Sequence, residues 1–401
     1  MKHIVLGAKK ETALRKVFAA ILTAMLSVLV PTALTSCHET IHIHPHPVSE
    51  KVTLTLIIDN DAPQPGAVVD YTITPPVIIY SDEVAATHHN RAGEISPQRA
   101  AEIAAAEARS RQLIDRFDEI APYEPDGRAW DILLRYEIYD KEASQVPDAE
   151  PVYANAILIP ADTRRPRHDV ELELPYGVVC VVASAQYVPK GSVNDYFFLT
   201  DPIYTLTCDM DLRQGQEDKF YRDCFCVSQQ FHIEPTETDG AEQHYEATLK
   251  RPQGRFMFLA DDYETYLKIA GVSLDDTQSH LHYPAYVNVA YSLLQGIPTS
   301  SGYDFGFEAT PRLFTVDAAP YVDLGHDWSI VNVGESTLPI ALTIYDDHIN
   351  NPINAHDGVQ VPVFKDKVTL AVGHWLTERG QEGGGGVRVD PSFTDEIVIH
   401  F

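Results

Sequence analysis

Apolar and polar residues alternate along most of this chain. The clearest example is residues 168–174, where Val170, Leu172 and Leu174 alternate with three acidic residues. A period of two residues is typical of a strand that buries one face. An unbroken apolar run instead predicts a central strand that is covered on both faces. A well-buried strand with two fairly apolar faces is expected at residues 51–59, a further strand at residues 129–139, and a central strand at residues 176–188.

The alternation stops at one place, where the sequence predicts a helix. Ser96 is a favoured capping residue, Pro97 suits the first helical position, and alanine-rich sequence follows. In the second half of the chain, short strands separated by turn residues predict a β-sandwich. We expect these strands at residues 246–260, 285–294, 327–333, 338–345, 359–363, 368–377, 387–390 and 396–401, and a short helix near residues 264–270.

The length of the chain favours two domains. Without a leader of 36 residues, about 365 residues remain, which is more than one core usually covers. The polar, turn-prone residues 234–243 are the best candidate boundary. We therefore predict an N-terminal β-sandwich domain over residues 51–240, with the helical insert at about residues 96–120. A C-terminal β-sandwich domain is predicted over residues 241–401.

The beginning of the chain has the order of features found in a lipoprotein signal. Basic residues precede an apolar run at residues 17–34, and Leu34-Thr35-Ser36-Cys37 follows. In this lipobox pattern a peptidase cuts before the cysteine, whose thiol carries lipid. We predict a signal peptide over residues 1–36, lipidation with palmitate at Cys37, and a tether over residues 37–50. A plain membrane anchor or an uncleaved signal is the alternative.

Net charge excludes one class of partner. The chain has 30 Lys and Arg residues against 58 Asp and Glu residues, which gives a formal net charge of −28. Such a surface repels phosphate backbones and anionic lipid headgroups. We therefore expect no nucleic-acid partner.

The tether contains three alternating histidines, His42, His44 and His46. In an extended chain they would lie on one side, where weak binding of a divalent metal is physically possible. The prolines between and after them disfavour a rigid pocket, so a solvated linker is the preferred interpretation. No metal or other cofactor is expected.

Four cysteines follow Cys37 in the sequence. An exported protein permits disulfides, and Cys208 is close enough in sequence to Cys224 or Cys226 to form a short bridge, although sequence alone leaves the pairing open. Cys224 and Cys226 would lie on one face of a strand, which is unlike a zinc site of the CxxC type.

Catalytic signatures are missing from the sequence. It contains no GxSxG elbow, HExxH helix, P-loop or GxGxxG turn, and its 17 histidines are scattered. We therefore predict that the protein is not an enzyme.

Several segments resemble the fimbrillin-like lipoproteins of Bacteroidales. The resemblance covers most of residues 51–401 except the helical insert. It is carried by loose motifs at residues 185–188 and 196–198, 248–261, 332–346, 361–377 and 389–399.

This resemblance implies an all-β fold of two tandem transthyretin-like Greek-key sandwiches. It also implies a lipid-anchored protein of the outer membrane, at the cell surface or the periplasmic face, that takes part in type V fimbriae (pili) and cell adhesion. Its partners would be other fimbrial subunits, bound by strand exchange. In that mode one subunit supplies a strand that the sheet of another subunit lacks.

The position in a fimbria depends on processing. Shaft subunits of the family are trimmed by an arginine-specific protease, which removes the lipid and the first strand. The first arginine after Cys37 is Arg91, and cutting there would discard more than one strand. An anchor or accessory subunit that keeps its lipid is therefore the preferred interpretation, with processing at Arg91 as the alternative.

A different function class stays open, namely a cell-surface lipoprotein that binds carbohydrate or another ligand and never polymerises. This alternative would require Trp130, Trp328 or Trp375 to be exposed. Each lies in a strand-like stretch with apolar alternate neighbours, so core packing is expected instead.

Overall fold

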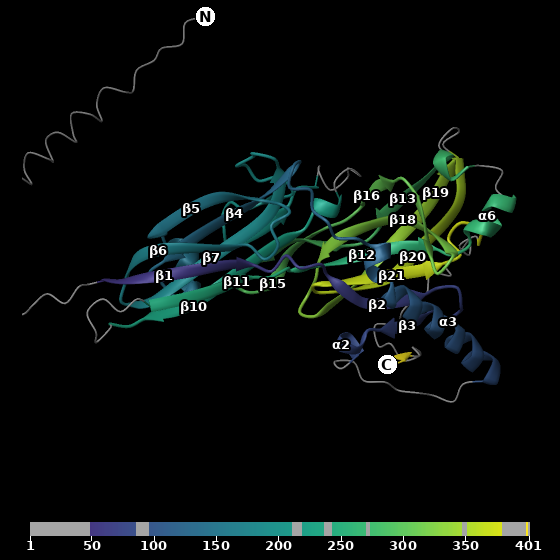
Figure 1. Cartoon of the computed structure of the whole chain (residues 1–401), viewed down its shortest axis with the longest axis horizontal. Helices are drawn as coiled ribbons and strands as arrows, with labels where there is room; N and C mark the ends of the chain where they lie inside the picture. The colour runs from purple at the N-terminus through teal and green to yellow at the C-terminus, as the bar shows by residue number, and fades with distance from the viewer. Residues whose placement is uncertain are drawn as a thin grey trace, which may run out of the picture. The chain divides into compact units, whose positions relative to one another are not determined.

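The computed structural model describes residues 49–85, 96–210, 219–235, 243–269, 273–346, 351–378 and 398–399. Residues Val48–Phe401 form one compact unit. Its described residues are mostly strands, which form five sheets (Figure 1). The predicted all-β sandwich class is confirmed. None of the described helices is both long and apolar enough to cross a membrane.

The first sandwich packs a three-stranded sheet, in the order β11-β1-β6, on a four-stranded sheet, in the order β10-β7-β4-β5. Its core joins Leu54 and Leu56 to Ile132 and Leu134, all of which are fully or almost fully buried. The elements are β1 (Ser49–Ile58), β4 (Trp130–Tyr139), the 3-10 helix η1 (Ala143–Asp148), β5 (Tyr153–Pro160), β6 (Arg167–Pro175), β7 (Gly177–Pro189), β10 (Cys224–Ile233) and β11 (Gln243–Leu249).

The second sandwich packs a seven-stranded sheet, in the order β17-β18-β12-β21-β2-β3-β22, on a four-stranded sheet, in the order β16-β13-β19-β20. Its core includes Phe256, Phe258, Leu342 and Trp375. The strands are β2 (Gln64–Asp70), β3 (Val77–Tyr80), β12 (Gln253–Ala260), β13 (Thr277–Tyr283), β16 (Phe305–Ala309), β17 (Arg312–Val316), β18 (Ala319–Ile330), β19 (Glu335–Asp346), β20 (Asn351–Phe364), β21 (Lys367–Gly373) and β22 (Val398–Ile399).

A fifth sheet, in the order β15-β14-β9-β8, takes strands from both halves of the sequence. Tyr291 on β14 lies opposite Leu206 on β9, and both side chains belong to the core of the first sandwich. The elements here are β8 (Phe198–Leu199), β9 (Thr205–Cys208), β14 (Val287–Ser292) and β15 (Ile297–Gly302). The remaining short helices are α2 (Asp82–Ala85), η2 (Lys219–Tyr221), α6 (Tyr263–Ile269) and η3 (Leu274–Asp276).

Strand pairing corrects the domain limits expected at residues 240 and 241. β2 lies parallel to β21 and antiparallel to β3, so residues 64–80 belong to the second sandwich. β11 lies parallel to β1, so residues 243–249 belong to the first. The turn-prone residues 234–243 join β10 to β11 and do not separate two domains. Turn-prone residues look alike in a connection within one domain and in a linker between two domains, which is why the sequence misled here.

The helical insert exists, but it covers the second sandwich and not the first. α3 (Pro97–Asp115) begins as predicted, with the Ser96 hydroxyl accepting a hydrogen bond from the Arg99 amide at 3.2 Å. α4 (Phe117–Ile120) follows directly. Leu113 and Phe117 pack in one cluster with Met257 of β12 and residues of β2 and β21.

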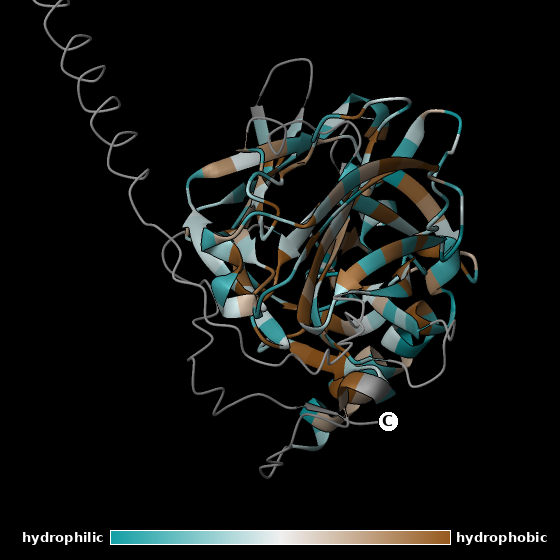
Figure 2. Cartoon of the chain, turned by 90° about the vertical axis from the view of Figure 1, so that its left-hand side faces the viewer, coloured by the Kyte–Doolittle hydropathy of each residue, from teal (hydrophilic) through white to brown (hydrophobic). Residues whose placement is uncertain are grey.

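Hydropathy follows this layout. Apolar segments, drawn brown in Figure 2, alternate with polar ones along the strands. β6 has the predicted pattern, because Val170 and Leu174 are buried while its acidic residues are exposed. β7 is buried on both faces along nearly its whole length, as expected for a central strand.

Candidate functional site

The first described strand is the centre of its sheet. β1 pairs with β11 over Val52–Ile58 and with β6 over Ser49–Ile57. Val52, Leu54, Leu56 and Ile58 are at most 2% exposed. Burial of such side chains contributes about 1.5–3 kcal/mol each. Removing β1 would leave an apolar slot with unpaired backbone groups on both sides.

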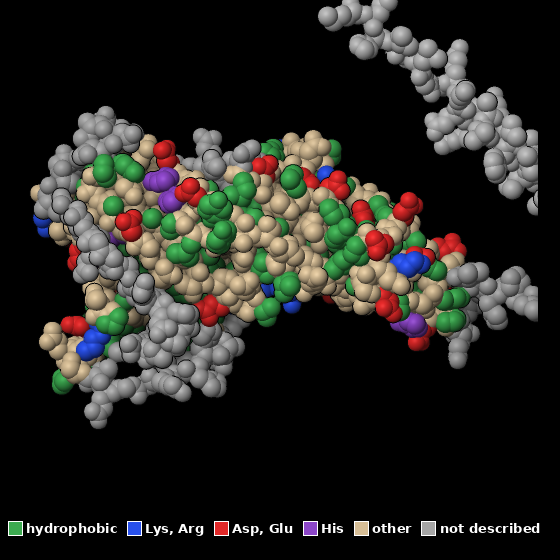
Figure 3. Space-filling view, turned by 180° about the vertical axis from the view of Figure 1, so that it is seen from behind, with side chains coloured by type: hydrophobic (Ala, Val, Ile, Leu, Met, Phe, Trp, Pro, Cys, Tyr) green, Lys and Arg blue, Asp and Glu red, His purple; other side chains and the backbone are tan. Residues whose placement is uncertain are grey.

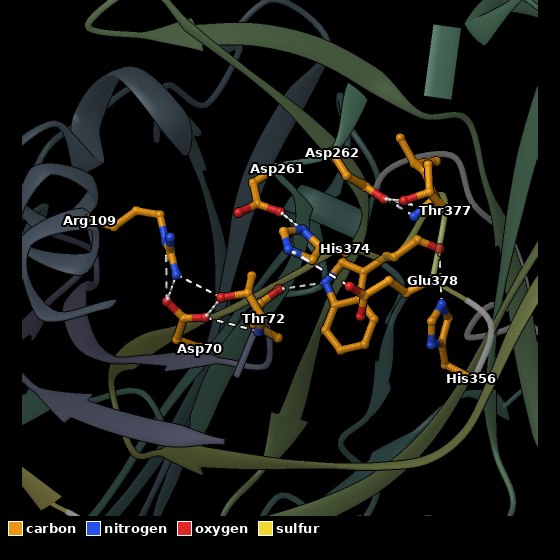
Figure 4. A network of polar contacts seen from close by, with 12 residues as sticks. Asp70, Thr72, Arg109, Asp261, Asp262, His356, His374, Thr377 and Glu378 are labelled. Atoms are coloured by element: carbon orange, nitrogen blue, oxygen red, sulfur yellow. Dashed lines mark hydrogen bonds and ion pairs between the residues drawn. The ribbon is translucent and has the colours of Figure 1, made fainter. Parts of the chain in front are cut away.

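A polar contact fastens β2 to the helical insert (Figure 4). The carboxylate of Asp70, which is 1% exposed, accepts hydrogen bonds from Arg109 Nη2 at 2.5 Å and Nε at 3.2 Å. Arg109 Nη2 also lies 2.7 Å from the Thr72 hydroxyl. The carboxylate is thus paired on its buried side, as an ion inside a protein must be.

A second polar cluster lies where β12 and β21 end. His374 Nδ1 is 2.7 Å from Asp261 Oδ1, and its Nε2 is 4.0 Å from Glu378. The hydrogen bond to Asp261 raises the pKa of His374, although burial opposes this. Asp262 accepts hydrogen bonds from the Thr377 amide at 2.7 Å and from its hydroxyl at 2.6 Å.

The same cluster reaches β20. Asn354 Nδ2 donates to the carbonyl oxygens of Trp375 at 2.8 Å and Glu378 at 2.7 Å. His356 lies beside it, with Nε2 2.9 Å from the Trp375 carbonyl, and burial lowers the pKa of His356. The pair of Asp261 and His374 has the form of an acid and base dyad, but among the described residues no Ser, Thr or Cys side chain is hydrogen-bonded to His374. The arrangement therefore fixes the turn after β21.

Buried charges connect the two sandwiches. Arg251 Nε donates to both carboxylate oxygens of Asp223, at 2.8 and 2.9 Å, and Arg251 Nη2 donates to the carbonyl of Asp61 at 3.1 Å. Arg222 donates to Asp327 on β18 at 2.8 Å. Burial raises the pKa of Asp223, and Arg251 opposes this shift. Both guanidinium groups are almost fully buried and paired with a carboxylate.

Arg255 on β12 is also buried, with 3% of its surface exposed. Among the described residues, no carboxylate lies within 4.0 Å of its guanidinium group, and its Nε has no hydrogen-bond partner. Phe220 and Trp328 flank it, with ring centroids 6.0 and 5.9 Å from the guanidinium carbon. Burial lowers the pKa of Arg255 to about 10, so the side chain stays charged at neutral pH.

The cysteines do not form the expected bridge. No disulfide joins Cys180, Cys208, Cys224 and Cys226 in this structure. Cys224 is directed at Gln253, whose Oε1 accepts from the thiol at 3.3 Å. Burial raises the pKa of Cys226 to about 12, so this thiol stays protonated.

The described residues contain no cluster of three or more His, Cys, Asp or Glu side chains that could hold a metal ion. His42, His44 and His46, Cys37 and Arg91 lie outside the described residues. The three tryptophans are buried, with Trp130 at 7%, Trp328 at 0% and Trp375 at 5% exposure. None of them can therefore serve as a surface aromatic platform.

Two exposed tyrosines were not singled out from the sequence. Tyr286 and Tyr303 are 70% and 62% exposed, and their ring centroids are 5.1 Å apart. Each lies in a turn between strands, and nothing in the local sequence distinguishes it from a buried tyrosine. Large exposed rings in contact with each other are a feature of surfaces that bind something.

The surface is acidic, as the composition requires. Figure 3 shows acidic side chains scattered over one face, with few basic ones among them. Exposed arginines of the first sandwich are neutralised locally, since Arg164 pairs with Asp61 at 3.1 Å and Arg167 with Glu246 at 3.3 Å.

The model of one protein family matches residues 86–401, which is most of the chain. The chain belongs to this family. It is described as a family of unknown function, DUF6562, so membership of DUF6562 assigns no activity. No curated protein sequence matches the chain significantly.

Solved structures with some likeness to this DUF6562 chain include a proposed cell adhesion protein and two fimbrial proteins. A proposed cell adhesion protein from Bacteroides eggerthii is 9% identical, has a TM-score of 0.36, and the match covers 84% of this chain and 90% of that one. The fimbrial anchor protein Mfa2 from Porphyromonas gingivalis is 10% identical and has a TM-score of 0.30, and the match covers 58% of this chain and 75% of that one. The tip fimbrial protein Mfa3 from the same organism is 14% identical and has a TM-score of 0.29, and the match covers 59% of this chain and 81% of that one. Likeness at these scores establishes neither a shared fold nor a shared function.

Proposed function

We propose that this chain is a lipid-anchored, non-enzymatic structural protein of a fimbrial or adhesive assembly at the cell surface. It acts as an anchor or accessory subunit that binds neighbouring subunits by addition of a β-strand. The observation that carries this proposal is the path of the N-terminal segment, which builds β1 into the first sandwich and β2 and β3 into the second.

This path supports a chain that is not trimmed. Arg91, the first arginine after Cys37, follows β3 and precedes α3. A cut there would remove one strand from the first sandwich and two neighbouring strands from the second. Asp70, the buried partner of Arg109, would be lost with them.

The energetic cost of such a cut is large. Leu56, Val68 and Ile79, one from each strand, are fully buried. Each contributes about 1.5–3 kcal/mol, and many similar side chains accompany them. The whole stability of a protein is only about 5–15 kcal/mol, so the remaining fragment would not stay folded. A single donated strand could replace β1, but it could not replace β2 and β3 as well.

The test is to determine the N-terminus of the protein recovered from cells. A blocked, lipidated Cys37 is expected, together with loss of membrane recovery in Cys37→Ser. A start at Ala92 would refute the anchor role. Recovery of Cys37→Ser in the membrane fraction, unchanged from wild type, would refute the lipid attachment.

The alternative is a ligand-binding lipoprotein that does not polymerise, and the exposed pair of Tyr286 and Tyr303 favours it. Rings of this kind can stack on sugars. Binding to a glycan array that is lost in both Tyr286→Ala and Tyr303→Ala, with no chain found in fimbrial fractions, would establish this alternative.

A further inference from the structure

Two histidines lie next to each other on the outer face of the second sandwich. β13 buries its odd-numbered residues, so the side chains of His280 and His282 point to the opposite side of the sheet, toward solvent. Their ring centroids are 6.2 Å apart, and the two ring planes differ by only 17°. Both side chains are only partly buried. The strand thus presents two imidazoles side by side on one surface.

The neighbouring strands leave this histidine pair accessible. On the β19 side, the residues directly opposite are small, namely Ala341 and Thr343. On the β16 side, Gly306 lies opposite His282. A Cβ atom at Gly306 would come within 2.9 Å of His280 Nε2. The glycine therefore gives the ring of His280 room to lean toward His282.

Carboxylates flank both histidines. His282 Nε2 is 3.0 Å from Asp304 Oδ1, and Glu308 lies directly opposite His280 in the register of β13 and β16. When a neutral imidazole donates its Nε2 proton to Asp304, its Nδ1 keeps a lone pair. Histidines that bind metal ions commonly donate their other ring nitrogen to a carboxylate in this way, which fixes the tautomer and the orientation of the ring.

The chemistry of these side chains selects one class of metal ion. Imidazole nitrogen suits Zn²⁺, Cu²⁺ and Ni²⁺, whereas Mg²⁺ and Ca²⁺ prefer oxygen ligands. The net charge of −28 attracts cations to the surface. Two imidazoles are fewer protein ligands than a permanent zinc centre has, in agreement with the absence of a three-ligand cluster among the described residues. Water therefore fills the remaining coordination positions, and the ion exchanges with solvent.

We propose that His280 and His282 form a surface site for a divalent transition metal ion, with Asp304 as the residue that orients His282. The ion bridges the two imidazoles, and water completes its coordination. This site goes beyond the proposed function and does not depend on it, because it involves no lipid, no strand exchange and no neighbouring subunit.

The test is a titration of the full-length chain with CuCl₂, followed by electron paramagnetic resonance, in which the Cu²⁺ signal reports the nitrogen atoms bound to it. All proteins carry alanine in place of His42, His44 and His46, because the tether could bind the same ions. This background protein should bind Cu²⁺ through two nitrogen ligands. MgCl₂ at the same concentration should not compete.

Three variants of this background protein separate the roles of the residues. His282→Ala should remove one nitrogen ligand and weaken Cu²⁺ binding. Asp304→Asn should keep both nitrogen ligands but weaken binding about 10–100-fold, since it removes the carboxylate that orients the ring. His244→Ala, at an exposed position of β11, is the matched control and should change neither the spectrum nor the affinity. Because these side chains are at least partly exposed, all three variants should unfold at nearly the temperature of the background protein without metal.

Two results would overturn the proposed metal site. One is a Cu²⁺ affinity in His282→Ala equal to that of the background protein. The other is a complete loss of Cu²⁺ binding when only the tether histidines are replaced. His280→Ala should reproduce the loss seen in His282→Ala, and it provides the measurement if that variant does not fold. None of these results depends on fimbriae, so the proposed function is tested separately.

Discussion

The contact between the two sandwiches and the contact beneath α3 depend on different kinds of interaction. The junction with the first sandwich depends on buried ion pairs, in which Arg251 binds Asp223 and Arg222 binds Asp327. The seam beneath α3 depends on apolar side chains, with an ion pair between Asp70 and Arg109 at its side. The comparison teaches that a buried charge specifies one geometry, because only one partner position satisfies it, whereas an apolar seam tolerates small shifts.

The largest loss of stability is expected from removing a buried ion pair at the junction of the two sandwiches. Asp223→Ala removes a fully buried carboxylate, which accepts both hydrogen bonds from Arg251 Nε. Loss of one member of a buried pair costs about 3–5 kcal/mol. Urea unfolding should show this decrease. The double variant Asp223→Ala with Arg251→Met should recover part of it, and failure to recover would mean that the charge itself is not what makes the single variant unstable.

A comparable but slightly smaller loss of the free energy of unfolding is expected from a substitution in the apolar seam beneath α3. Leu113 is fully buried between α3 and the sheet. Leu113→Ala should lower the free energy of unfolding by about 2–5 kcal/mol, depending on how far the cavity collapses. Leu113→Met keeps most of the volume and should cost less than about 1.5 kcal/mol. If the methionine variant were as unstable as the alanine variant, the apolar seam would require one geometry, as the buried ion pairs of the junction do.

Arg255 extends the comparison, because it is a buried charge with no carboxylate within 4.0 Å among the residues that the structure describes. Replacement of Arg251 should be strongly destabilising, but Arg255→Met should be neutral or stabilising by about 1 kcal/mol, because the unpaired charge no longer has to be buried. Thermal unfolding of the two methionine variants provides the measurement. A loss of several kcal/mol in Arg255→Met would show that the flanking Phe220 and Trp328 rings stabilise the charge.

The smallest expected effect is a dependence of folding stability on pH. Because the pKa of His374 is raised in the folded state by Asp261, its contribution to stability is fully present below the unfolded pKa of about 6.5 and is lost as pH rises through the folded value. His374→Gln should therefore cost less than about 1 kcal/mol, and the cost should be greater at pH 6 than at pH 9. His356 has a lowered pKa from burial, so His356→Gln should have the opposite dependence. Denaturant unfolding at several pH values distinguishes the two.

Local features of the fold were predictable, and long-range pairings were not. The cap at Ser96, the half-buried β6 and the doubly covered β7 follow from short-range patterns. The partner of β2 does not, since Val68 lies opposite Leu370 across about 300 residues and any apolar strand has a similar local pattern.

The candidate sites show the same limit. Burial of the tryptophans was correctly expected from their apolar alternate neighbours, but the exposure of Tyr286 and Tyr303 depends on tertiary context. The absence of charge along β5 is visible in the sequence. Its position at the edge of a sheet is not visible there, because it depends on which strands pair.

The path of the N-terminal segment also has a kinetic consequence. Because β2 pairs with β21 and β1 pairs with β11, neither early strand has its parallel neighbour until much later residues have left the ribosome. Pairings of such long sequence separation fold slowly. Waiting strands expose apolar edges that invite aggregation. Until β21 is available, β2 therefore lacks one of its two neighbours in the sheet.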